Sequence, residues 1–494
     1  MLFSSHEFLF GFLPVALLAF HLARRYLPNK AALGVLAIFS FFFYGWWNPP
    51  YLALLGGSVI SNFLIARWLS ARQDSKVLYV GVALNLAVLG YFKYRNFFLE
   101  NIGHLTGNGW ELEALFVPLA ISFFTFQQIA FLVDVKDGRA HVDNPTGYVA
   151  FVALFPQLIA GPIVLYREIE QQFTEIGLTG ANLLSKFAKG LFVFAIGLFK
   201  KIALADSIAP YADTAFAEAH SLTFLEAWAG AVAYSLQLYF DFSGYSDMAV
   251  GLGLMLGLTL PFNFDVPFRS TSMIVFWKRW HITMTRFFMM YLYSPIALAV
   301  MRWSAARDLS SLPAFSATIA MPIIITFLLS GLWHGAAWTF VAFGGVNAIG
   351  LTVNHAWREL KLPRPPAFIG WLLTMLTVVI SFVYFRAASL ADAHAVLTAM
   401  FSPHHLILPN WLSGLATAFD VPWRTLELFA SGTYTVRLAI WILLLSCLAL
   451  IRRNPAARPD DIKPTWPTAL LTAGALLISI ALLDRPQAFI YFQF

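Results

Sequence analysis

The sequence predicts an all-α polytopic membrane protein, and three observations support this fold class. Of the 494 residues, 59% are hydrophobic and only 12% are charged, whereas a soluble domain has roughly 25% charged residues. Charge-free apolar runs recur along nearly the whole chain, and about 20 such residues cross the hydrocarbon core of a bilayer. No linker typical of a domain boundary interrupts the series, so we expect residues 1–494 to form a single integral membrane domain.

The apolar runs define the expected spans in chain order. Up to residue 262 they are Phe8–Arg24, Ala31–Trp47, Tyr51–Ala66, Val77–Phe92, Ala114–Val133, Pro145–Tyr166, Phe187–Phe199, Ala227–Phe240 and Met248–Phe262. Beyond it they are Phe287–Met301, two spans within Ser316–Trp357, Phe368–Phe385, Leu438–Ile451 and Pro467–Leu483. Several are short or contain a proline, at Pro118, Pro156, Pro162 and Pro322. We therefore expect re-entrant and broken helices, which are tolerated where protein or a water-filled cavity covers the freed backbone groups.

The charges of the first loops predict an N-terminus outside the cytoplasm. Cations follow the first and third spans, whereas the turn 48–50 after the second span has none. These cations are Arg24, Arg25, Lys30, Arg67, Arg72 and Lys76. Because cytoplasmic loops are enriched in Lys and Arg, the two basic loops are expected to be cytoplasmic. The net charge of +6 fits cations at loop ends that face anionic lipid, and we expect no nucleic-acid partner.

Several chemistries lack their motifs in this chain. It contains no G-x-S-x-G nucleophile elbow, no G-x-x-x-x-G-K phosphate loop and no H-E-x-x-H metal helix, so a serine hydrolase, an NTPase and a zinc protease lose support. Cys447 is the only cysteine, which excludes an intramolecular disulfide and a cysteine-rich metal site. The adjacent His404 and His405 would point to different helix faces, so we expect a solvated loop there and no metal site.

The first informative polar groups form a stripe in the middle third of the chain. Gln237, Asp241 and Tyr245 recur at i, i+4 and i+8, so in a helix they share one face of an otherwise apolar rod. Polar side chains at membrane depth either line a functional cavity or join helices by hydrogen bonds. The sequence leaves both alternatives open.

The next informative segment is residues 276–281. Trp277 and His281 lie at i, i+4, so a helix here would place them on one face and turn Lys278 and Arg279 away from it. Trp280 adds a further aromatic anchor. The two cations either reach lipid phosphate or bind an anionic donor at the cytoplasmic mouth of the protein, and both interpretations stay open.

His334 is the strongest candidate for chemistry. It follows Trp333 inside the stretch Leu309–Trp357, which contains no Asp, Glu, Lys or Arg, and polar side chains at such depth tend to be functional. Histidine titrates near neutral pH, as a general base in acyl transfer must. Since His281 is a second imidazole in a Trp-flanked segment, we predict that the two share one cavity. Trp280, Trp333 and His281 are candidate donors to a developing oxyanion.

Taken in order, these segments resemble the membrane-bound O-acyltransferase family, and most closely its alginate O-acetyltransferase branch. The resemblance covers nearly the whole chain and rests on residues 3–5, 8–10, 90–94, 121–126, 155–162, 237–247, 276–281, 331–335 and 489–494. After Tyr293 that branch continues into a short glycine-rich basic loop, whereas this chain continues with residues 294–303. The surface near the acceptor or the partner is therefore expected to differ.

The resemblance implies a bundle of many helices around a transmembrane tunnel in the inner membrane, with His334 and His281 as catalytic residues. It implies transfer of an acyl group, most simply acetyl, from a cytoplasmic thioester such as acetyl-CoA to an extracytoplasmic polysaccharide. No bound cofactor is expected. A separate extracytoplasmic acetyltransferase of the SGNH-hydrolase type is the implied partner.

A transporter or channel is the alternative function. Broken helices with intramembrane Asp241, His281 and His334 would also suit a substrate or proton path. Thioester hydrolysis that is lost with the His334 imidazole would distinguish an enzyme from a transporter.

Overall fold

The computed structural model describes residues 1–107, 113, 115–174, 181–309, 311–402, 407–409, 413–418, 421–424, 432–451, 454–483 and 489–490. Nearly all regular structure in these ranges is helical. The β-structure in them is one parallel pair of two-residue strands, β1 (Leu408–Pro409) and β2 (Trp423–Arg424). Six helical stretches of the described chain are long and apolar enough to cross a membrane, which confirms the predicted class of all-α, multi-pass membrane protein.

The contacts divide the chain into two units that interleave along the sequence. The first unit comprises residues 1–199, 243–262 and 455–492, and the second comprises 200–242, 263–454 and 493–494. Helix α12 (Phe224–Met255) continues from the second unit into the first.

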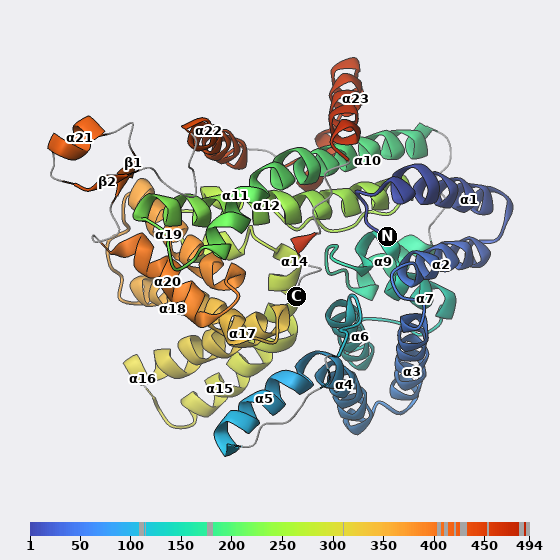
Figure 1. Cartoon of the computed structure of the whole chain (residues 1–494). Helices are drawn as coiled ribbons and strands as arrows, with labels where there is room; N and C mark the ends of the chain where they lie inside the picture. The colour runs from blue at the N-terminus through green and yellow to red at the C-terminus, as the bar shows by residue number, and fades with distance from the viewer. Residues whose placement is uncertain are drawn as a thin grey trace. The chain divides into compact units, whose positions relative to one another are not determined.

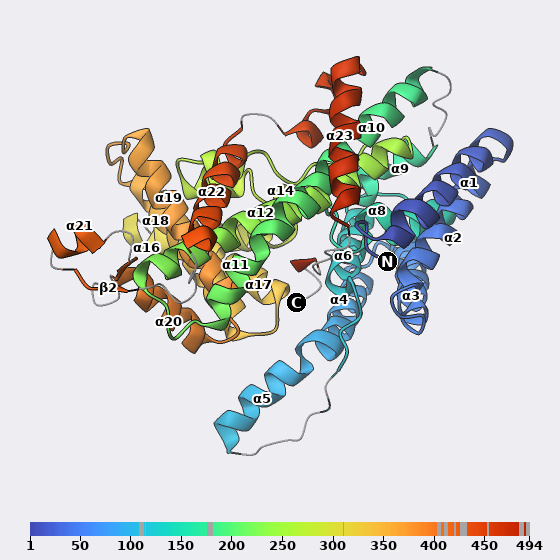
Figure 2. The same ribbon diagram turned by 45° about the horizontal axis from the view of Figure 1, so that its top comes forward.

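The first unit contains the blue to teal helices of Figure 1, which contact both their neighbours in sequence and helices further along the chain. Its α-helices are α1 (Leu13–Tyr26), α2 (Asn29–Gly45), α3 (Tyr51–Arg72), α4 (Ser75–Leu89), α5 (Arg95–Thr106), α6 (Ile121–Lys136), α7 (Pro145–Ala153), α8 (Phe155–Leu158), α9 (Tyr166–Thr174), α10 (Ala181–Phe199) and α23 (Trp466–Ala481). Short π-helical segments, Glu7–Phe12 and Gly90–Tyr94, precede α1 and follow α4. The late helix α23 returns to pack on α10 (Figure 2).

The second unit holds the segments that carry both candidate histidines. Its α-helices are α11 (Asp206–Ala217), α13 (Met273–Trp277), α14 (Ile282–Phe288), α15 (Ser294–Ala305), α16 (Ser311–Phe315), α17 (Met321–His334), α18 (Trp338–Glu359), α19 (Ala367–Arg386), α20 (Leu390–Phe401), α21 (Ser413–Ala418) and α22 (Gly432–Ala449). Three π-helical segments join some of them: Lys200–Ala205, Met289–Tyr293 and Ser316–Ala320.

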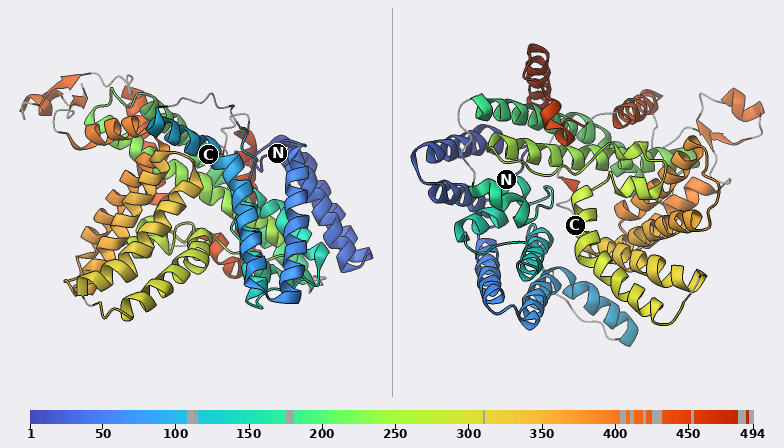
Figure 3. Two further views of the ribbon diagram at one scale, coloured as in Figure 1. Left: turned by 90° about the horizontal axis from the view of Figure 1, so that it is seen from below. Right: turned by 180° about the vertical axis from the view of Figure 1, so that it is seen from behind.

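Glycines bring α17 and α18 into backbone contact, and the two helices lie side by side in both views of Figure 3. A Cβ atom on Gly331 would lie 2.1 Å from the carbonyl oxygen of Phe340, and one on Gly344 would lie 2.2 Å from that of Phe327. Such small-residue contacts let helices approach closely. Helix α17 ends at His334 because Gly335 is extended (φ −159°, ψ 148°), so the imidazole lies at the end of a rigid helix pair.

Three predicted spans differ from the observed helices. Pro145–Tyr166 is not one helix: α7 and α8 are short, and residues 159–165 are irregular and buried. This is irregular backbone covered by protein, as expected for a broken helix. The separate spans Ala227–Phe240 and Met248–Phe262 were also wrong, because residues 224–255 form the single helix α12. The polar stripe of Gln237, Asp241 and Tyr245 lies on that helix and is buried.

Candidate functional site

His281 lies in a turn between two short helices. Helix α13 ends at Trp277, and His281 itself adopts a left-handed conformation (φ 43°, ψ 53°) immediately before α14. The prediction of one helix over residues 276–281 was therefore wrong. A left-handed conformation costs a residue with a Cβ atom about 1–2 kcal/mol, and strain of this kind is often found at functional sites.

Asn263 holds this turn in place. Its Oδ1 atom accepts hydrogen bonds from the Thr283 backbone N–H (3.2 Å) and from the Thr283 hydroxyl (3.0 Å), and it lies 3.0 Å from His281 Nδ1. The Ile282 N–H also donates to the Asn263 carbonyl (2.9 Å). A backbone N–H can only donate, so the atom facing it must be the amide oxygen. His281 Nδ1 must then donate to the same oxygen, which leaves the lone pair of a neutral ring on Nε2.

The two imidazoles lie together in the second unit. The ring centroids of His281 and His334 are 6.4 Å apart with their planes at 53°, and the two residues are 0% and 6% exposed. A pair of rings at this separation can contact one small group or a bridging water. Trp333 completes the cluster, with its ring 6.3 Å from His281 and 4.9 Å from His334.

Aromatic side chains surround the imidazole pair. Phe242 meets the His281 ring edge-to-face at 4.7 Å, and Phe343 and Phe385 meet the His334 ring at 5.7 Å and 5.2 Å. These contacts fix both rings and keep bulk water from them. Trp280 is buried outside this group, where it packs on Phe264, Phe268, Phe276 and Phe382.

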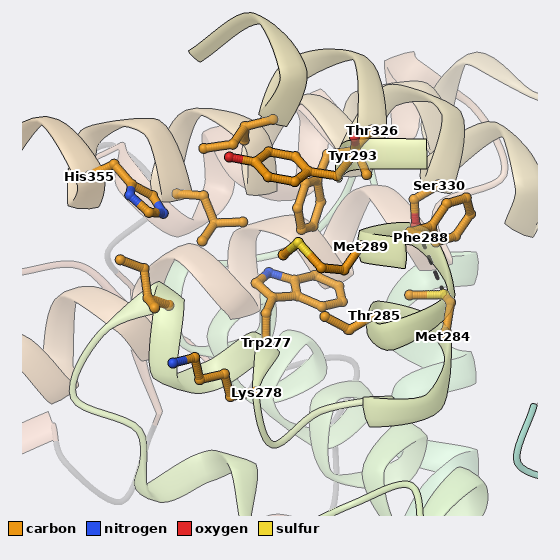
Figure 4. Close-up of a pocket in the computed structure, with 14 residues that line it drawn as sticks. Trp277, Lys278, Met284, Thr285, Phe288, Met289, Tyr293, Thr326, Ser330 and His355 are labelled. Atoms are coloured by element: carbon orange, nitrogen blue, oxygen red, sulfur yellow. Dashed lines mark hydrogen bonds between the residues drawn. The ribbon is translucent and has the colours of Figure 1, made fainter. Parts of the chain in front are cut away.

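An apolar cavity of about 170 Å³ lies along α13, α14 and α17 (Figure 4). The Trp277 indole lies across its middle, Lys278 and His355 lie towards one end, and Met284 and Ser330 lie towards the other. Ser330 precedes His334 by one turn of α17, so this second end approaches the histidine pair along the helix.

Three polar atoms of the cavity wall are buried without a hydrogen-bond partner among the described residues. They are Trp277 Nε1, Thr285 Oγ1 and Thr326 Oγ1. Buried polar groups are almost always satisfied in native proteins. The cavity therefore offers one obligate donor and two hydroxyls to a guest with carbonyl or amide groups. Lys278 lines the cavity and is exposed, whereas Arg279 is half-buried and lines none of the described cavities.

The members of the polar stripe on α12 lie in three different environments. Asp241 pairs with Lys201, whose Nζ lies 2.7 Å from Asp241 Oδ1 and 2.6 Å from Asp206 Oδ1. Tyr245 stacks between Phe3 and Phe489 with centroids at 4.6 Å and 4.5 Å. Gln237 Oε1 is buried and has no hydrogen-bond partner within the described ranges.

Asn263 and Lys201 are the residues that sequence reasoning missed. A lone asparagine in a loop 18 residues before His281 has no recognisable pattern. Lys201 follows an apolar helix in the sequence, and only its buried ion pair with Asp241 in the structure shows that it belongs to this polar cluster. Among the residues that the structure describes, no group of three or more His, Cys, Asp or Glu side chains could hold a metal ion. His404 and His405 lie outside those residues.

Comparisons with known proteins show which family and relatives this chain is similar to. The profile of the membrane-bound O-acyltransferase family (MBOAT) matches residues 141–391, which include both histidines. A peptidoglycan O-acetyltransferase of Helicobacter pylori is 36% identical, over 100% of this chain and 98% of its own length. A probable alginate O-acetylase AlgI of Pseudomonas aeruginosa is 39% identical over 81% of this chain and 75% of its own. A teichoic acid D-alanyltransferase of Streptococcus thermophilus is 26% identical over 55% of this chain and 69% of its own.

Proposed function

The chain belongs to the membrane-bound O-acyltransferase family, and from this premise we propose that it moves an acetyl group from a cytoplasmic thioester to O-acetylate an extracytoplasmic polysaccharide. The observation that supports the proposal most is the buried pair of His281 and His334, enclosed by aromatic side chains. Acyl transfer to a hydroxyl needs a positioned general base, and a buried imidazole can supply it.

In the proposed reaction, His334 removes the proton of the acceptor hydroxyl as its oxygen attacks the thioester carbonyl carbon. The new C–O bond forms, the C–S bond breaks, and the leaving thiolate takes the proton back from His334. The products are an ester and a thiol, so the proton and both bonds are accounted for. The Trp333 indole N–H serves as the donor to the oxyanion that develops on the carbonyl oxygen. His281 was also expected to donate, but its one ring N–H faces Asn263, and its Nε2 atom can only accept.

The apolar cavity is the proposed site of the donor arm. Its volume of about 170 Å³ suits a narrow chain, and its unsatisfied indole N–H and hydroxyls suit the carbonyl and amide groups of a thioester arm. Entry past Lys278 and exit at Ser330 would deliver the acyl carbon to within one helical turn of His334. Three of the predicted tunnel residues lie outside this cavity: Gln237, Tyr245 and Arg279. Their proposed role in the tunnel rests on the sequence alone.

Three further parts of the proposal rest on the family resemblance. The protein works in the inner membrane. Its two units act as one domain, and α12 supports this interpretation because its residues belong to both units. The path for the acetyl group is a tunnel through the helices. A partner of the SGNH-hydrolase type receives the group outside and completes its transfer to the polysaccharide.

The first prediction tests the base. Protein purified in nanodiscs is supplied with acetyl-CoA labelled in its acetyl group, and transfer and hydrolysis are both followed. His334→Ala is expected to lower the rate by roughly a hundred- to ten-thousandfold, the contribution of one positioned base. His104→Ala, an exposed histidine of α5, is the matched control. Unchanged turnover in His334→Ala would refute the proposed base, and passage of a solute without any thioester cleavage would favour a transporter.

A further inference from the structure

The second unit contains a second, polar cavity of about 700 Å³. It lies where the connection between α18 and α19 meets the chain just before α13. Three cations line it, Arg358, Lys361 and Arg364, together with the polar side chains of Thr271, Ser272 and Asn354. No acidic residue is among its lining residues in the described chain.

The connection that carries the cations is held against the rest of the unit. Trp357 Nε1 donates a hydrogen bond to the Pro363 carbonyl (2.9 Å), which folds the connection back on the end of α18. A Cβ atom on Gly370 would lie 2.6 Å from the Thr271 carbonyl oxygen, so the start of α19 is pressed against the residues before α13. The cavity is therefore a built feature of the unit, and its cations are brought together by packing.

No acidic side chain of the described chain lies within salt-bridge distance of these cations. Arg358, Lys361 and Arg364 are exposed. Two guanidinium forks and an ammonium around one cavity match phosphate oxygens in geometry and charge. A volume of about 700 Å³ lies within the roughly 300–1,000 Å³ of small-molecule sites.

We propose that this cavity binds the phosphate groups of a ligand. Helices α13 and α18 line both cavities: they give Trp277 and His355 to the apolar one, and Val275 and Arg358 to the polar one. A phosphate-bearing molecule held here lies beside the entrance of the proposed donor site. The identification of that molecule as the acyl donor rests on the proposed function, whereas the phosphate site itself does not. Its phosphates come either from the nucleotide part of a thioester donor or from the headgroup of an anionic lipid.

The second prediction compares both sources. The probe for the first is coenzyme A, bound to the full chain in phosphatidylcholine nanodiscs, and the probe for the second is phosphatidylglycerol retained by the purified protein in native mass spectrometry. The combined variant Arg358→Gln, Lys361→Gln, Arg364→Gln is expected to weaken the binding of one of the two probes by about tenfold or more. The control combines Arg67→Gln, Lys76→Gln and Arg302→Gln, which removes the same charge from exposed positions that line neither cavity.

The outcomes separate the possibilities. Loss of coenzyme A binding in the cavity variant alone identifies the nucleotide source, and loss of phosphatidylglycerol alone identifies the lipid. Equal binding of both probes by wild type, cavity variant and control would overturn the proposed site. His334→Ala is expected to keep phosphate binding. If binding persists but no acetyl transfer is found in the wild type, the proposed function fails while the phosphate site stands.

Discussion

At the residue scale, Asn263 determines how His281 can take part in chemistry. Its oxygen must face the Thr283 N–H, and this fixes the proton of His281 on Nδ1 and the lone pair on Nε2. The sequence identified both histidines because each directly follows a tryptophan, but it could not identify Asn263. The contact depends on how the loop before α13 folds back on the His281 turn, which no periodicity encodes.

The third prediction concerns Asn263. Asn263→Leu removes the acceptor and leaves the Thr283 N–H and His281 Nδ1–H buried without it, at a cost of about 1–3 kcal/mol in the free energy of unfolding. We expect turnover to fall far more than donor KM changes, because the reactive tautomer is lost. Asn263→Asp keeps an acceptor oxygen and should retain more turnover. The measurement is acetyl transfer per folded molecule, with folding followed by thermal unfolding.

Asn62→Leu is the matched control for that experiment. Asn62 is also buried, and its amide exchanges hydrogen bonds with Asn85 (3.2 Å and 2.6 Å) in the first unit. Its loss should lower the melting temperature and leave turnover per folded molecule unchanged. If the two leucine variants lose turnover equally, Asn263 is only a structural residue.

At the scale of the elements, the sequence predicted long apolar helices well and interrupted ones poorly. The span Phe368–Phe385 matches α19 (Ala367–Arg386) to within one residue at each end, because hydropathy alone defines a helix that faces lipid. Helix α12 was split in two because its polar residues interrupt the apolar run. Their partners are distant in sequence: Lys201 lies 40 residues before Asp241, and only the folded chain shows that the charge is paired.

The fourth prediction is an order of stability among variants of this buried cluster. Lys201→Met leaves Asp206 and Asp241 buried without their shared ammonium, whereas Asp241→Asn leaves Lys201 still paired with Asp206. Removal of one partner of a buried ion pair costs about 3–5 kcal/mol, so Lys201→Met should lower the melting temperature more than Asp241→Asn. The double variant Lys201→Met, Asp241→Leu should recover part of the loss. Equal melting temperatures for both single variants would contradict a shared cation.

At the scale of the whole molecule, the basic loops after α1 and α3 define an orientation that can be measured. The fifth prediction uses a cysteine-free chain, Cys447→Ser, into which single cysteines are introduced. Asn48→Cys, in the uncharged turn between α2 and α3, should react with a membrane-impermeant maleimide in intact cells. Gln73→Cys, after α3, should react only after the membrane is opened. The reverse labelling pattern would place the N-terminus in the cytoplasm.

The pairing of α10 with α23 has a consequence for biosynthesis. Roughly 270 residues separate these two helices in sequence, and ribosomes add about 5–20 residues per second. During synthesis, the face of α10 that receives α23 therefore waits for tens of seconds in the membrane, covered only by lipid or by an insertion factor. A protein that is stalled or truncated before Trp466 would display that face permanently, and membrane quality-control proteases could recognise it as a mark of an unfinished chain.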